Sequence, residues 1–155
     1  MSLTITVLLL VVMLAAIGFM TYWSLVASWR NLDASLRGRL GPGENIIFRA
    51  IATFMKGRFP RLVFNMKHGL VLVTNQRILF AQPIYLPFVP IGRSFTQVPL
   101  DAIERVETEV GAVAIEADGE RLTFVPAKSK LWPFLRGSLA EELAAAINMR
   151  RAVGA

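Results

Sequence analysis

Few side chains in this sequence could carry out acid–base or nucleophilic chemistry. There is one histidine, His68, and no cysteine. His68 stands beside Gly69 at the start of an expected strand, which is a context typical of a surface residue and not of a general base. The acidic run of Glu104, Glu107 and Glu109 is typical of a solvated face. No glycine-rich phosphate loop or metal-ligand spacing is present. We therefore predict a protein that is not an enzyme, with no cofactor and no small-molecule substrate.

Basic side chains are concentrated in one part of the chain. Residues 30–67 contain eight Lys or Arg and two Asp or Glu, whereas residues 68–155 contain nine of each, so the first part carries the whole net charge of +6. Near a membrane, each such charge is attracted to anionic headgroups by about 1 kcal/mol. The residues expected to contact lipid headgroups are Arg30, Arg37, Arg39, Lys56, Arg58, Arg61 and Lys67. For the first three, a role in setting membrane topology is the alternative.

Two further segments could bind a partner. Residues 83–91 (PIYLPFVPI) contain three prolines, two aromatic residues and no charge. Because an exposed apolar loop usually marks an interface, these residues are predicted to contact a protein partner or a membrane. The alternative is a loop folded back over the core. A smaller basic and aromatic cluster lies before the C-terminal helix. The contact residues expected from both segments are Tyr85, Leu86, Phe88, Trp132 and Phe134.

The N-terminal segment decides where such surfaces could act. Residues 1–29 carry no charged side chain. At about 1.5 Å per residue, residues 3–27 form a helix long enough to cross roughly 30 Å of hydrocarbon. A cleaved signal peptide is the main alternative, but the segment has no Lys or Arg at its start and its apolar run is too long. We therefore predict a transmembrane anchor over 1–29. Its interfacial aromatic belt would be Tyr22, Trp23 and Trp29.

The charges that flank this segment predict its orientation. Arg30, Arg37 and Arg39 follow the segment, and no basic side chain precedes it. Because positive charge stays on the cytoplasmic side, we expect a single-pass protein of the inner membrane with its N-terminus outside and its C-terminal domain in the cytoplasm. The lack of cysteine agrees with a reducing compartment. Nucleic acid would also bind the basic and aromatic run at 54–61, but a tethered domain meets anionic lipid first, so no nucleic-acid partner is expected.

The rest of the chain predicts short strands followed by one helix. Residues 30–43 are interpreted as a helical or irregular connector that ends in Gly-Pro-Gly, and 44–155 as one domain. Alternating apolar residues and turn signals predict strands at 45–55, 69–74, 77–81, 94–99, 102–110, 112–117 and 120–125. The pair Asp118-Gly119 predicts a tight hairpin. Ser138 with Glu141 forms a capping box for a terminal amphipathic helix.

The apolar stripe of this helix is expected to close a core between the strands. The expected core residues are Ile47, Leu72, Ile103, Val106, Ile115, Phe124, Leu139, Leu143 and Ile147. Either Ile78 or Leu79 joins them, since neighbours on a strand point to opposite faces and the register is open.

Two stretches resemble a known family. Residues 69–80 (GLVLVTNQRILF) resemble the strand, Thr-Asn-x-Arg and second strand of bacterial pleckstrin-homology-like and GRAM-like domains, and 98–106 (VPLDAIERV) resemble a later segment of these domains. The resemblance implies an α+β fold: a bent antiparallel β-barrel of about seven strands closed by a C-terminal α-helix, here behind a transmembrane helix. It implies binding or scaffolding and no enzyme activity.

Two functions follow as alternatives. In the first, the chain is an accessory subunit of a larger membrane protein complex, such as a respiratory, photosynthetic or transport complex, with integral membrane protein subunits as partners. In the second, it is a free module that senses anionic lipids or signals.

Overall fold

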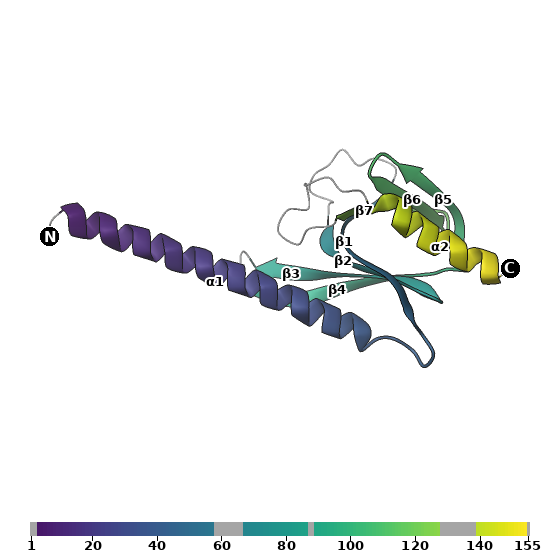
Figure 1. Ribbon diagram of the computed structural model, residues 1–155, viewed down its shortest axis with the longest axis horizontal. Helices are drawn as coiled ribbons and strands as arrows, with labels where there is room; N and C mark the ends of the chain where they lie inside the picture. The colour runs from purple at the N-terminus through teal and green to yellow at the C-terminus, as the bar shows by residue number, and fades with distance from the viewer. Residues whose placement is uncertain (1–2, 58–66, 87–88, 128–138, 155) are drawn as a thin grey trace.

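A computed structural model of the chain describes residues 3–57, 67–86, 89–127 and 139–154 (Figure 1). Seven strands lie between two helices. In chain order the elements are α1 (Leu3–Arg37), β1 (Ile46–Lys56), β2 (Lys67–Thr74), β3 (Arg77–Leu86), β4 (Val89–Pro99), β5 (Ile103–Glu109), β6 (Ala112–Ala117), β7 (Glu120–Ala127) and α2 (Ala140–Gly154). Each predicted strand and the terminal helix are confirmed. Ser138, the predicted cap of that helix, lies outside the described residues.

The strands form one antiparallel sheet in the order β4-β3-β2-β1-β7-β6-β5. Strand β1 joins the two halves of the sheet: it pairs with β2 from Ile46 to Phe54 and with β7 from Ile51 to Lys56. In the described residues β4 and β5 pair with one neighbour each, so they are the two edges of the sheet. The sheet bends around an apolar core, as expected for a pleckstrin-homology-like fold.

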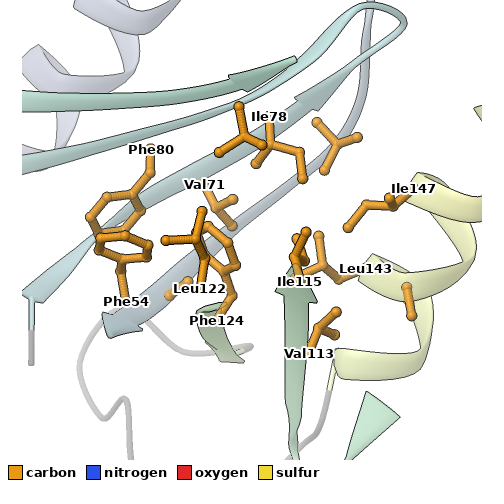
Figure 2. Packing of buried hydrophobic residues seen from close by; sticks show 14 of the residues in the cluster. Phe54, Val71, Ile78, Phe80, Val113, Ile115, Leu122, Phe124, Leu143 and Ile147 are labelled. Carbon is orange, nitrogen blue, oxygen red and sulfur yellow. The ribbon is translucent and has the colours of Figure 1, made fainter. Parts of the chain in front are cut away.

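The first apolar cluster lies inside this bend and is covered by α2 (Figure 2). Its centre is a group of three aromatic rings, in which the Phe54 centroid lies 5.0 Å from that of Phe80 and 5.1 Å from that of Phe124. Leu143 and Ile147 of α2 are fully buried against it. The α2 stripe therefore closes the core as the sequence predicts.

Two local features fix the register of the strands. Asp118 and Gly119 both have positive φ, 52° and 72°, as a tight type I′ hairpin requires, so the predicted turn between β6 and β7 is confirmed. On β2, a Cβ atom at Gly69 would lie 2.1 Å from the carbonyl oxygen of Ala81, so only glycine allows this close approach to β3.

A second apolar cluster lies on the other face of the sheet, beneath the C-terminal half of α1 (Figure 1). Leu32 and Leu36 of α1 are fully buried against β2 and β3. Leu79 belongs to this second cluster and Ile78 to the first, so both residues are buried, which the expectation of a single core did not foresee. Leu72 also lies under α1 instead of in the first cluster, and Ile47 is only half-buried.

The predicted transmembrane anchor is contradicted. Within the described residues, no helix combines the length and the apolarity that crossing a bilayer requires. Helix α1 does not end near Trp29 but continues to Arg37, and its last turns pack on the sheet as part of the domain. The predicted single-pass location in the inner membrane, with the N-terminus outside, is contradicted by the same finding.

The predicted irregular loop at 83–91 is also corrected. Strand β3 continues to Leu86 and β4 begins at Val89, so most of the segment belongs to a long hairpin. Pro83 is compatible with this because β2 pairs with β3 only up to Ala81. Beyond Ala81, β3 pairs only with β4 among the described strands. On the side of β3 that faces away from β4, a proline therefore removes no hydrogen bond of the sheet.

Candidate functional site

A partly buried ion pair holds the chain segment that follows α1 against the sheet. Arg77 donates from Nε to Glu44 Oε1 at 3.0 Å and from Nη2 to Glu44 Oε2 at 2.9 Å. The Thr74 hydroxyl lies 2.7 Å from Glu44 Oε1 and accepts the Arg77 amide at 3.0 Å. We call Glu44, Thr74 and Arg77 the latch.

The latch connects three parts of the chain. Arg77 Nη2 also donates to the Arg39 carbonyl at 2.8 Å, just beyond α1, and the Gly41 amide donates to Glu44 at 2.7 Å. The Arg77 guanidinium lowers the pKa of the Glu44 carboxyl from 4.5 to about 2, against the opposing effect of burial. The carboxylate is therefore charged at neutral pH and holds the chain that leaves α1 against the β2–β3 turn.

The N-terminal half of α1 makes a contrast with this packed end. Residues 5–20 extend away from the sheet (Figure 1). They carry twelve large apolar side chains that are between 49% and 71% exposed. Residues 7–14 are all apolar, and consecutive residues point in every direction around a helix, so no face of this segment is polar. We call residues 5–20 the apolar arm.

Three of the predicted lipid-contact residues already contact other residues of the domain. Arg37 pairs with Asp33 at 3.1 Å and Lys56 pairs with Glu120 at 2.8 Å. Arg39 places its guanidinium carbon 3.8 Å from the centroid of the Phe95 ring. Arg30 and Lys67 are exposed. Arg58 and Arg61 lie outside the described residues, so headgroup contact stays a prediction.

The predicted partner and belt residues are placed only in part. Trp29 is half-buried and packs against the second apolar cluster. Tyr22 and Trp23 are on α1, and Tyr85 and Leu86 are on β3, but the side chains of these four lie outside what the structure describes. Phe88, Trp132 and Phe134 are also outside the described residues. Contacts through these side chains therefore remain predictions.

The latch is the feature that sequence reasoning missed. In the sequence, the Thr-Asn-x-Arg motif at 74–77 indicates only a resemblance to a family. Its role depends on Glu44, thirty residues earlier, which has no spacing signal. Asn75 adds to the same joint, because its Oδ1 accepts the Asn45 amide at 2.9 Å and its Nδ2 donates to the Gly43 carbonyl at 3.1 Å. The one signal for this contact in the sequence is the isolated acidic residue Glu44, directly after Gly-Pro-Gly.

His68 is placed as predicted, exposed at the start of β2, with Nδ1 2.9 Å from the Thr53 hydroxyl. Glu107 and Glu109 form ion pairs with Arg121 on the outer face of the β5–β7 half of the sheet. Part of the acidic run is therefore a charge network on that face.

A bent seven-stranded antiparallel sheet with a C-terminal helix over its core defines a pleckstrin-homology-like fold, a class of binding modules. Residues 40–131 match the family described as Bacterial PH domain, and the chain belongs to this family. No curated protein matches the chain.

One solved structure supports the fold. The hSac2 domain from human phosphoinositide phosphatase Sac2 superposes with a TM-score of 0.55 at 9% identity, covering 81% of this chain and 82% of that domain. The Vps36 N-terminal PH domain gives a TM-score of 0.49 at 17% identity and 74% and 84% coverage. The C-terminal domain of an unknown protein from Leishmania infantum gives 0.48 at 12% identity and 80% and 94% coverage.

Proposed function

We propose that this protein is a non-catalytic binding module that acts as an accessory subunit of a larger membrane protein complex. The observation that carries the proposal is the apolar arm, a stretch of helix with exposed apolar side chains and no charge. A helix that is apolar on all sides is stable only when it is enclosed by other apolar groups. Integral membrane subunits expose such helices, and they remain the proposed partners.

The way α1 is attached to the sheet supports this proposal. The packed turns around Leu32 and Leu36 and the latch at Glu44 fix the helix direction relative to the sheet. Because α1 is one continuous helix from Leu3 to Arg37, the arm keeps that direction. A partner that binds the arm would therefore hold the pleckstrin-homology-like domain in a defined orientation relative to itself. The proposal does not require α1 to cross a bilayer.

Lipid sensing, the alternative function, has less support from the described side chains. Two of the seven predicted headgroup residues, Arg37 and Lys56, already pair with carboxylates. Exposed pairs of this kind are worth about 0–1 kcal/mol and could open, but they lower the free positive charge. We therefore assign the main contact to the apolar arm.

A test of this function is the mass of the complex after gentle detergent extraction. We expect the wild-type chain to purify in a fixed ratio with another polypeptide. The variant Leu8→Glu with Val12→Glu places two charges on the arm and should purify alone. Asn31→Glu with Ala34→Glu is the matched control, since it adds two charges at exposed positions on the packed half of the same helix. Recovery of wild type alone, or loss of the partner in both variants, would contradict the proposal.

A further inference from the structure

A second surface lies away from the apolar arm, at the β4 edge of the sheet. Arg93, Phe95 and Gln97 alternate along β4 and share one face. Arg93 donates to the Ser35 hydroxyl of α1, and Gln97 accepts Arg77 Nη1 at 2.9 Å. Phe95, between them, lies beneath the Arg39 guanidinium. A cavity of about 340 Å³ at this edge is lined by Arg39, Arg77, Leu79, Phe95, Thr96 and Gln97.

The charge of this surface is unbalanced. Arg39, Arg77 and Arg93 supply three guanidinium groups, and the one carboxylate that pairs with any of them among the described residues is Glu44, which is bound by Arg77. Among the described residues, neither Arg39 nor Arg93 forms an ion pair with a carboxylate. Stacking on Phe95 holds the Arg39 guanidinium in place with its N–H groups available, the arrangement that suits a bidentate carboxylate.

Among the described strands, the same part of β4 pairs only with β3, so its other side has backbone groups without a partner in the sheet. The Leu100 amide donates to the Gln76 carbonyl at 3.0 Å, which points it toward β3. The direction of the backbone amides alternates along a strand, so the amides of Val98, Thr96 and Ser94 also point toward β3. The amides of Arg93, Phe95 and Gln97 therefore point out from the open edge, where another strand could pair. Pro99 is consistent with this alternation, because the backbone N–H that proline lacks would point away from β3.

We propose that the β4 edge binds an extended acidic peptide segment of a partner protein, which adds as an eighth strand and places a carboxylate on Arg39. Residues directly opposite on paired strands share a face, with Cβ atoms about 4.5–5.5 Å apart. A Glu opposite Phe95 would consequently lie beside the Arg39 guanidinium. Main-chain hydrogen bonds supply affinity and the Arg39–carboxylate pair supplies selectivity.

The test uses the purified full chain and two fluorescein-labelled peptides, TVTVEVTVT and its counterpart with Gln in place of Glu. We expect the Glu peptide to bind about tenfold more tightly at low salt. Arg39→Gln should reduce its affinity to that of the Gln peptide. Equal binding of both peptides to the wild type would overturn the proposal.

A matched pair of variants tests strand addition itself. Gln97→Ala removes the side chain but keeps the outward amide, whereas Gln97→Pro also removes that donor without removing a bond to β3. We expect Gln97→Ala to bind both peptides within about threefold of wild type and Gln97→Pro to bind neither. Circular dichroism checks that Gln97→Pro is folded. If this variant does not fold, the peptide affinity of Arg39→Gln, which changes an exposed position, tests the proposal instead. Arg39-dependent binding of phosphatidylglycerol vesicles with no peptide binding would point to a lipid headgroup and contradict the proposal.

Discussion

The two helices of this protein use the sheet in opposite ways. Helix α2 is short and packs its apolar stripe into the bend of the sheet (Figure 2). Helix α1 is more than twice as long and extends away from the sheet (Figure 1). Among its described side chains, the buried ones lie in its last turns, and the mostly apolar side chains of residues 5–20 are exposed. We therefore expect the fold of the domain to depend on α2, and to depend much less on the N-terminal half of α1.

The first way to test this comparison is to damage the core that α2 closes. Phe124→Ala should lower the free energy of unfolding by about 4 kcal/mol, because a fully buried aromatic ring is replaced by a cavity. Urea unfolding monitored by circular dichroism measures the change. Thr123→Ala, on the outer face of the same strand, should cost less than about 1 kcal/mol. Similar costs for the two variants would mean that this cluster is not the folding core.

A second test breaks the latch. Arg77→Ala leaves the buried Glu44 carboxylate without its cation, and removing one partner of a buried pair costs about 3 kcal/mol or more. Arg105→Ala breaks an exposed pair with Glu107 and should cost below about 1 kcal/mol. The same urea experiment compares them. If the two variants were equally stable, the latch would not fix α1 to the sheet.

The latch also predicts a pH dependence. The pKa of Glu44 is lowered in the folded protein to about 2 from 4.5, so its contribution to stability is fully present above pH 4.5 and is lost as the pH falls toward 2. The loss should be smaller than for Arg77→Ala, because protonated Glu44 is neutral. Glu44→Gln cannot titrate and should show a flatter stability profile over this range. Parallel profiles for the variant and wild type would rule the mechanism out.

The smallest expected effect separates the two helices directly. Leu36→Ala should lower the free energy of local opening of residues 29–37 by about 2 kcal/mol while global stability falls less. Hydrogen exchange resolved along the chain detects the difference. Leu143→Ala on α2 should instead raise exchange throughout the strands. Global loss of protection in Leu36→Ala would place α1 among the elements that the fold requires.

The sequence was informative where a pattern is local. Strand alternation, the Asp118-Gly119 turn and the apolar stripe of α2 are short-range signals, and each is confirmed. Ile78 and Leu79 point to opposite faces of the sheet, and both are buried because α1 covers the second face. An apolar helix gives the same hydropathy signal whether it enters a bilayer or packs on protein, so the predicted anchor rested on a pattern that does not separate these cases.

The candidate site was harder to predict. The latch joins Glu44 to Arg77 and Thr74 across a hairpin, and the β4 edge brings Arg39 onto Phe95 from a different element. Such contacts depend on how the strands are ordered, and side-chain type alone does not report them. The charge of Arg39 led to the prediction that it contacts lipid headgroups, which stays a prediction, whereas its stacking on Phe95 was not predicted.

A photo-crosslinking amino acid at position 8 tests the central claim most directly. With the crosslinker in place of Leu8, illumination before extraction should join the chain to a second polypeptide in high yield, and the crosslinker in place of Asn31 should give none. If position 8 gave only uncrosslinked monomer while the domain remained folded, the apolar arm would not be a protein contact and the proposed function would fail.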